Sequence, residues 1–313
     1  MFFDAHSDIW TDVTIRRLAG EERVFARRHL PRLRSGGCEG GILALWIDQP
    51  HRAAERTAEM MECIRAEGED GFRIVRTVEK ARRAREAGEF YAFIGAEGLA
   101  AIGEDISRID AYYDFGVRLA MLTWNEVNAL AAGAVSGQDT GLTAAGRRAV
   151  DRLRELGMVM DVSHLNERGF WEVLDRYGGP IAASHSNCRV LCDVPRNLTD
   201  AQLRAIRDSG GVVGLNVCKM FVRAEAEKQT VEQLAIHAAH MAEVMGVEHV
   251  GCGFDFCECL PDDSPENNPR GLEDCSRAPE FFRCLERLGM SAAEREQIAR
   301  GNFLRLLEQV LGA

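Results

Sequence analysis

The stretch YAFIGAEGLA (residues 91–100) begins as an apolar run and then places a lone carboxylate, Glu97, between small residues. Its first half is typical of a buried strand, and Glu97 comes where such a strand gives way to a loop. Taken alone, Glu97 is expected to be a solvated loop residue, because glutamate is rarely buried unless it is paired. A different role for this carboxylate depends on what the other strands carry at the same point.

Apolar, strand-like runs recur along the whole chain. Besides 91–98, they lie at 2–6, 40–48, 117–124, 157–164, 180–186, 211–217 and 249–256. Several of the segments between them have helical character, and two begin with good N-cap residues, Thr143 and Thr199. Strands that alternate with helices predict a parallel sheet covered on both faces. Eight such units predict a closed (β/α)8 TIM barrel, for which about 250 residues suffice.

The rest of the chain predicts an insertion after the first strand (roughly 9–37) and a helical C-terminal extension from about residue 278. No linker, internal repeat or low-complexity tract interrupts the pattern, so we expect a single domain over residues 1–313.

Charge and hydropathy exclude several classes of partner. The formal net charge of −11 argues against nucleic acid or an anionic membrane surface. No apolar stretch approaches the roughly 20 residues of a membrane span. The N-terminus MFFDAHSDIW lacks the basic region and long apolar core of a signal peptide. We therefore expect a cytoplasmic protein whose ten cysteines are free thiols, and the spacings of Cys188 with Cys192 and of Cys257 with Cys259 do not match a structural zinc site.

Metal-competent side chains follow five of the eight predicted strands. In chain order they are His6, Asp8, Glu97, His164, His185 and Asp255. Singly, each histidine is most simply a hydrogen-bonded core or rim residue and each carboxylate a solvated one. In a (β/α)8 barrel, however, the carboxyl ends of the strands meet at one face, where the active site lies. Three imidazoles with two or three carboxylates suit zinc or another divalent transition ion, and a carboxylate such as Glu97 can bridge two ions about 3.5–4 Å apart.

These residues lie in stretches that together resemble the membrane (renal) dipeptidase family, a branch of the metal-dependent amidohydrolase superfamily. The stretches are DAHSD (4–8), GAEG (95–98), MDVSHLN (160–166), ASHSNCRVLCDVPRN (183–197) and VGCGFDF (250–256). Each motif is weak alone, but the ordered set is specific and covers essentially the whole chain.

The resemblance implies a binuclear zinc-dependent dipeptidase that cleaves small dipeptides with a free C-terminal carboxylate. His6 and Asp8 would hold one zinc ion, His164 and His185 the other, and Glu97 would bridge them. A metal-bridging hydroxide would be the nucleophile, and Asp255 would carry the proton from the attacking water to the leaving amine. Arg196 would bind the substrate carboxylate; its alternative is a surface arginine beside the Thr199 helix cap.

Two residues depart from the family pattern. Family dipeptidases carry a histidine that contacts the substrate carbonyl after the fourth strand, where this chain has Trp124, followed by Asn125. Cys257 replaces the usual second acidic residue after Asp255. We expect Trp124 or Asn125 to serve the oxyanion side of an altered pocket, or Trp124 merely to pack the strand end. The alternative functions are hydrolysis of a non-peptide amide, lactone or ester, and metal binding without turnover.

Two further features are expected to be structural. His237 and His240, three residues apart on a predicted helix, are expected to face solvent or the partner subunit of a homodimer. The charge-rich segment 16–29 is expected to form a solvated face or a cover over the mouth of the site.

Overall fold

The computed structural model describes residues 1–261 and 263–312. Its centre is a parallel sheet whose hydrogen-bonded strand order is β1-β2-β4-β5-β6-β7-β8-β9. The strands are β1 (Phe2–Ser7), β2 (Cys38–Trp46), β3 (Phe72–Ile74), β4 (Phe90–Glu97), β5 (Val117–Met121), β6 (Val159–Asp161), β7 (Ala182–Ala183), β8 (Val212–Leu215) and β9 (Val250–Cys252). Every strand run expected from the sequence overlaps one of these strands.

The first and last strands of this order also lie side by side, so the sheet is nearly closed. Beyond β9 the backbone N–H of Asp255 donates to the carbonyl of His6 (3.2 Å), and the N–H of Phe254 donates to the Asp4 carboxylate (2.7 Å). The predicted (β/α)8 TIM barrel is therefore confirmed.

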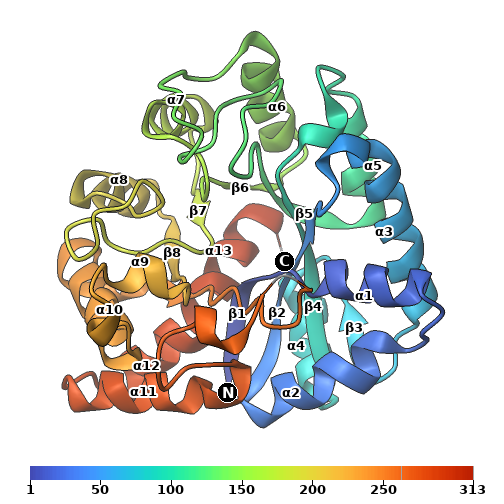
Figure 1. The fold of residues 1–313 in the computed structure, drawn as a ribbon. Helices are drawn as coiled ribbons and strands as arrows, with labels where there is room; N and C mark the ends of the chain where they lie inside the picture. The colour runs from blue at the N-terminus through green and yellow to red at the C-terminus, as the bar shows by residue number, and fades with distance from the viewer. Residues whose placement is uncertain (262, 313) are drawn as a thin grey trace.

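Helices surround the strands (Figure 1). They are α1 (Ile9–Leu18), α2 (Leu30–Ser35), α3 (Ala53–Glu67), α4 (Val78–Glu86), α5 (Arg108–Phe115), α6 (Ala144–Glu155), α7 (Glu167–Tyr177), α8 (Asp200–Asp208), α9 (Lys219–Val222), α10 (Val231–Met245), α11 (Ala278–Arg287), α12 (Ala292–Glu296) and α13 (Asn302–Leu311). The expected caps are present, since the Thr143 hydroxyl accepts from the Gly146 N–H and Thr199 forms a capping box with Gln202. Among the described residues, no helix combines the length and the apolarity that a membrane span requires.

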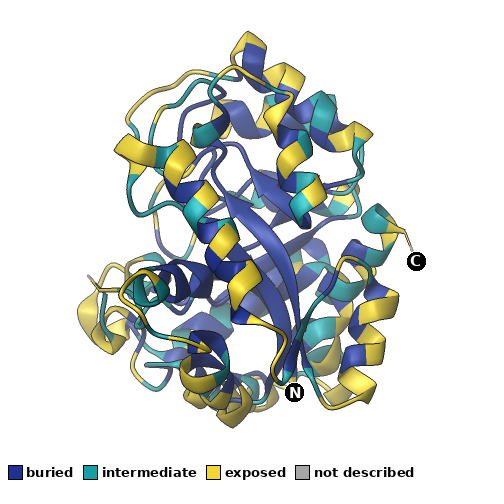
Figure 2. Ribbon diagram, turned by 90° about the vertical axis from the view of Figure 1, so that its right-hand side faces the viewer, coloured by how far each residue is buried: buried dark blue, intermediate teal, exposed yellow. Residues whose placement is uncertain are grey.

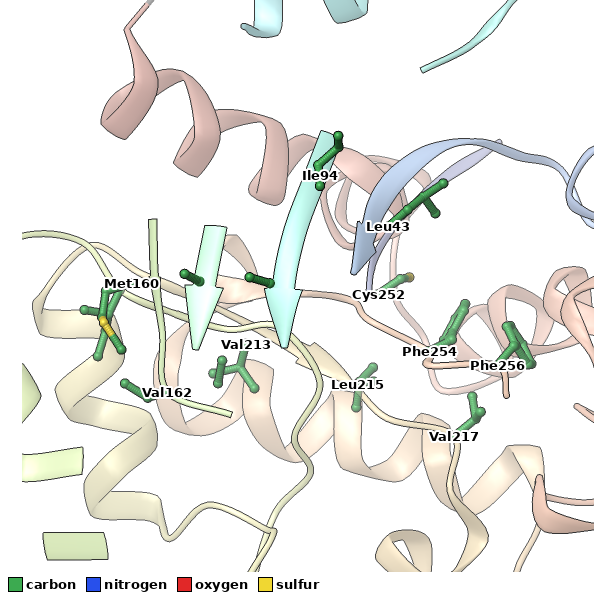
Figure 3. Packing of buried hydrophobic residues seen from close by; sticks show 14 of the residues in the cluster. Leu43, Ile94, Met160, Val162, Val213, Leu215, Val217, Cys252, Phe254 and Phe256 are labelled. Carbon is green, nitrogen blue, oxygen red and sulfur yellow. The ribbon is translucent and has the colours of Figure 1, made fainter. Parts of the chain in front are cut away.

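The strands form the buried centre of the molecule, and the helices expose their outer faces (Figure 2). Outward-facing strand residues such as Leu43, Ile94 and Val213 pack against the helices in one large cluster (Figure 3). Alternate residues, such as Phe3, Phe93 and Leu119, belong to a second, smaller cluster. This alternation is the two-residue period of strands that are covered on both faces.

The C-terminal helix α13 covers the amino-terminal end of the barrel. Phe303 packs beside Phe3 (6.4 Å between ring centroids), and Arg305 donates to the backbone carbonyls of Gly210 and Glu248, which precede β8 and β9. The opposite end, where the strands terminate, is left for the loops that carry the polar residues.

Two details differ from the sequence expectation. The region 9–37 is not simply an insertion, because α1 is the regular helix that connects β1 to β2. The short strand β3 was not expected. It pairs with the first part of β4 (Phe90–Ala92), and β5 pairs with the later part of β4 along the same edge. Three residues, of which only Phe72 is fully buried, give too short a pattern to separate a strand from a loop.

Candidate metal centre

The six metal-competent residues converge at the carboxyl end of the barrel. His6 lies in β1 and Glu97 ends β4, while Asp8, His164, His185 and Asp255 come within three residues of the ends of β1, β6, β7 and β9. All but Asp255 are buried. The parallel barrel thus brings together residues that are up to 249 positions apart in the sequence.

One group of ligand atoms forms around His6. Its Nε2 lies 3.3 Å from Oε2 of Glu97 and 3.6 Å from Oδ1 of Asp8, and 3.9 Å from Oδ1 of Asp255. His6, Asp8 and Asp255 offer three such atoms within 4.8 Å of one another.

A second group forms around the other oxygen of Glu97. Oε1 lies 2.8 Å from Nε2 of His164 and 3.7 Å from Nε2 of His185, and these two nitrogens are 2.9 Å apart. The two oxygens of one buried carboxylate therefore face two different sets of imidazoles, which is the arrangement that a bridging ligand needs.

The donor set fits divalent metal ions. Nε2 of His6, Oδ1 of Asp8 and Oε2 of Glu97 are buried and have no hydrogen-bond partner among the described residues. A buried polar atom without a partner costs free energy, and three of them that face one another mark a site for a cation. Imidazole nitrogen with carboxylate oxygen is the ligand combination typical of zinc and similar transition ions.

The pKa shifts of these groups favour a bound cation. Burial and the neighbouring Asp8 raise the pKa of Glu97 well above its usual range. Burial opposes a charge on His6, but Glu97 and Asp8 raise its pKa well above the ordinary value. A divalent cation would stabilise both carboxylates in their charged form.

Hydrogen bonds fix how the histidines present their nitrogens. Nδ1 of His164 lies 2.9 Å from Oδ1 of Asn125. Because an amide oxygen carries no hydrogen, Nδ1 must donate, which leaves the lone pair of Nε2 directed at Glu97. Ser184 lies 2.8 Å from Nδ1 of His185 and 3.4 Å from Nδ1 of His6.

Two site residues hold unusual backbone conformations. His164 and Asp255 have φ angles of 68° and 60°, in the left-handed region that residues other than glycine rarely adopt. Such strain is retained where the surrounding structure enforces it, most often at functional sites. Here it turns each side chain back over the end of the barrel.

Asp255 is held by two neighbours. The Asn216 side chain donates to its Oδ2 (3.1 Å), and the thiol of Cys257 donates to its Oδ1 (3.2 Å). Partial burial and the charge of Asp8 raise the pKa of Asp255 to about 7, although His6 acts in the opposite direction. Cys257, which replaces an acidic residue of the family pattern, therefore supports the Asp255 carboxylate.

Arg196 lies beside the metal-competent group, on the loop that follows β7. It is buried, one Nη atom donates to the carbonyl of His185 (3.3 Å), and the guanidinium lies over the ring of Phe221. No carboxylate of the described residues lies within 4 Å of its nitrogens, and Nε has no partner there. This contradicts the alternative of a surface arginine, since a buried guanidinium without an anion is poised to bind one.

Trp124 and Asn125 follow β5 at the edge of the same site. The Trp124 ring is partly exposed and packs edge-on against Trp46, with 5.5 Å between centroids, and its centroid lies 6.1 Å from that of His164. Asn125 faces His164 through its oxygen, so only its Nδ2 is left to donate elsewhere.

Sequence reasoning missed Ser184, Asn216 and the contact of Asn125 with His164. Ser184 stands in the ASHS motif, next to His185, which is a signal that the sequence does offer. Asn216 follows a strand that carries no ligand, and nothing in its sequence context points to the site.

The expectation for His237 was wrong. His237 is fully buried: its Nδ1 accepts from the Cys188 N–H (3.0 Å), and its Nε2 donates to the Val222 carbonyl (2.8 Å). It joins α10 to the loop that follows His185. His240 lies 2.8 Å from an oxygen of Asp200 and is only partly exposed.

The charge-rich segment 16–29 is only partly solvated. Phe25 is buried against Phe72 and Phe90, the first residues of β3 and β4. The segment therefore packs toward the amino-terminal end of the barrel and does not cover the site. The ten cysteines, all within the described residues, are free thiols in this structure.

The fold and the donor set together define a metal-dependent hydrolase built on a (β/α)8 barrel. The model of the membrane dipeptidase family (peptidase family M19) matches residues 1–312. The chain therefore belongs to the membrane dipeptidase family, as its motifs indicated, and its enzyme class is that of the metallodipeptidases.

Individual relatives are similar to this chain over much of its length. The chain is 36% identical over 244 residues to an uncharacterized protein in the pqqA 5′ region of Klebsiella pneumoniae, covering 74% of this chain and 86% of that protein. It is also 36% identical over 218 residues to an uncharacterized dipeptidase of Schizosaccharomyces pombe. This match covers 69% of this chain but only about half (52%) of that protein.

A solved structure extends the likeness over the whole chain. A metallopeptidase from Rhodobacter sphaeroides, liganded with a phosphinate mimic of the dipeptide L-Ala-D-Ala, superposes with a TM-score of 0.88 at 27% identity and covers 99% of each chain.

Proposed function

We propose that this chain is a dipeptidase that uses two divalent metal ions, most simply Zn2+, and cleaves small dipeptides that end in a free carboxylate. His6 and Asp8 would hold one ion, His164 and His185 the other, and Glu97 would bridge them. When bound, such ions supply an activated water and polarise the scissile carbonyl.

The observation that carries the substrate class is Arg196. A buried guanidinium beside the metal ligands, without an anionic partner in the described chain, suits the terminal carboxylate of a short peptide. The solved relative that is liganded with a dipeptide mimic supports the same class of substrate.

The chain's own groups would handle the proton. The Asp255 carboxylate lies 3.9 Å from Nε2 of His6 and is fixed by Asn216 and Cys257. From this place it would accept a proton from the attacking water and deliver it to the leaving amine. Trp124, or Nδ2 of Asn125, would border the carbonyl oxygen, and this role stays a prediction.

The first test is turnover of a panel of dipeptides by protein loaded with Zn2+, Co2+ or Mn2+. Arg196→Met should then lower kcat/KM for free dipeptides roughly 10- to 150-fold, the equivalent of about 1.5–3 kcal/mol for a hydrogen bond to a charged group. Dipeptide amides, which lack the carboxylate, should lose much less.

The exposed Arg204 on α8 provides the control variant, Arg204→Met, which should change neither rate. Equal losses on acids and amides would make Arg196 structural. No turnover of any dipeptide with any of the three metals would contradict the proposed function itself.

A further inference from the structure

A cavity of about 350 Å³ opens beside Glu97 at the ends of β2, β4 and β5. We propose that it binds the side chain of the substrate's N-terminal residue and selects a large apolar, preferably aromatic, side chain. This inference rests on the proposed dipeptidase function and adds to it a substrate preference. The cavity walls include Trp46, Ile47, Pro50, Ala53, Ala100 and Trp124.

The register of the sheet places this cavity next to the reacting centre. Trp46 pairs with Glu97 where β2 and β4 end, so one tryptophan stands directly beside the carboxylate that faces both histidine groups. Trp124 forms the adjoining wall through its edge-on contact with Trp46. Gly98 allows this approach, since a Cβ there would lie 3.1 Å from the backbone nitrogen of Trp124.

The direction in which a dipeptide binds, from its N-terminus to its C-terminus, decides which of its two side chains reaches the cavity. Arg196, on the loop after β7, would bind the C-terminal carboxylate, and the cavity lies across the ring of strands at β2, β4 and β5. The scissile carbonyl, between these two points at Glu97, belongs to the N-terminal residue. The side chain of that residue therefore extends toward the two tryptophans.

The chemistry of the walls favours an apolar occupant. Glu97 stands where the cavity meets the metal-competent group, and the two other carboxylates of the lining, Asp48 and Glu126, already have partners. Arg56 donates to both oxygens of Asp48 (2.7 and 3.0 Å), and the Asn128 side chain donates to Glu126 (2.9 Å). What remains is ring and alkyl surface, which a flat aromatic side chain covers best. The volume is at the low end of the ~300–1,000 Å³ of ligand pockets, as a site for one side chain should be.

The experiment compares two dipeptide series on the Zn2+-loaded protein. In the first, the N-terminal residue of X-Ala is Gly, Ala, Leu, Phe or Lys; in the second, the same residues stand at the C-terminal position of Ala-X. We expect kcat/KM to be at least about 10-fold higher for Phe-Ala than for Gly-Ala, within the range that one apolar pocket supplies. The Ala-X series should vary less.

Variants then assign the preference to the cavity. Trp46→Ala and Trp124→Ala should each reduce the ratio of Phe-Ala to Gly-Ala several-fold, whatever happens to the absolute rates. The matched control is Trp171→Ala on α7. Trp171 is 38% exposed against 37% for Trp124 and likewise packs edge-on against one aromatic ring, Phe170, but it lies outside the cavity. This variant should keep the ratio of the native protein.

Different failures have different meanings. A flat X-Ala series, a preference for Lys-Ala, or a ratio that survives both cavity variants would overturn the proposal while leaving the dipeptidase function intact. If the Trp46→Ala and Trp124→Ala variants instead lost selectivity in the Ala-X series, the cavity would bind the side chain of the C-terminal residue. That result would also overturn the proposal. No turnover in either series would remove the dipeptidase function, and with it this inference.

Discussion

Asp255 combines a strained backbone, two hydrogen-bonded neighbours and a position beside His6. We expect Asp255→Asn to keep its metal, because in the proposed site His6, Asp8, Glu97, His164 and His185 would supply the ligands. Turnover should fall by about 10²–10⁴-fold, the usual contribution of general acid–base catalysis. Metal analysis and dipeptide kinetics on the same preparation measure both effects.

The control for this variant is Asp200→Asn. Asp200 is also a partly exposed carboxylate that faces a histidine, His240, but it lies on α8 outside the site. Full activity of Asp255→Asn would assign proton transfer to another group, and loss of a metal ion would make Asp255 a ligand.

At the residue scale, the sequence predicted which side chains gather at the site, and the reason is the geometry of strand ends. Residue types that bind metal, found directly after apolar runs, are brought to one face by parallel pairing. What the sequence could not show depends on contacts between distant segments. The left-handed backbone of His164, the contact of Asn125 with His164 and the buried role of His237 all arise from loops whose paths no local pattern describes.

At the element scale, the shortest strand, β7, continues into a tightly packed segment. β7 has two residues, and its continuation at Ser184 is approached closely by two glycines, Gly214 in the neighbouring strand β8 and Gly253 just after β9. A Cβ on Gly253 would lie 1.6 Å from the Ser184 carbonyl oxygen, and one on Gly214 would lie 1.9 Å from it. This close contact holds the backbone that positions His185.

Gly253→Ala should therefore destabilise the protein by about 1–3 kcal/mol or more, as other overpacked sites do, and weaken metal binding through His185. Urea denaturation and competition with a chelator measure the two effects. Gly179→Ala is the matched control, since a Cβ there meets only the Tyr177 ring at 3.5 Å. A Gly253→Ala protein with native stability and metal affinity would contradict the tight-packing account.

The elements themselves were predicted unevenly. The long apolar run 91–98 was predicted within one residue of β4, and the helix that begins after the N-cap Thr143 was predicted within a few residues of α6. β7 is shorter than its predicted run (180–186) because the loop that carries His185 leaves the sheet early. The path of this loop is set by tertiary contacts, among them the hydrogen bond from the Cys188 N–H to His237.

At the scale of the whole molecule, the candidate metal centre joins strands from both halves of the chain. Asp8, Glu97 and Asp255 bring three carboxylates together where β1, β4 and β9 end. Without a cation their mutual repulsion opposes closure of the barrel, whereas ions that bind only the native state stabilise it by mass action.

Removal of metal with a chelator should therefore lower the unfolding temperature. At a metal concentration of 100 Kd the stabilisation is about 2.7 kcal/mol, which corresponds to a shift of roughly 4 °C for a chain of this size. Added Zn2+ should restore the shift, while Mg2+, which prefers oxygen ligands, should restore less. If neither the chelator nor added Zn2+ changes the unfolding temperature, metal binding does not stabilise the fold, and this prediction is contradicted.

The most direct test of the account is the metal content of Glu97→Ala, since the central claim is that this one carboxylate serves two ions. The native protein should hold about two equivalents of Zn2+ per chain, and His164→Ala should hold about one. Glu126→Ala, which removes a carboxylate at the cavity outside the ligand groups, should keep both. For Glu97→Ala we predict that both ions are lost together; a folded variant that retains two ions, or loses only one, would contradict the bridging role.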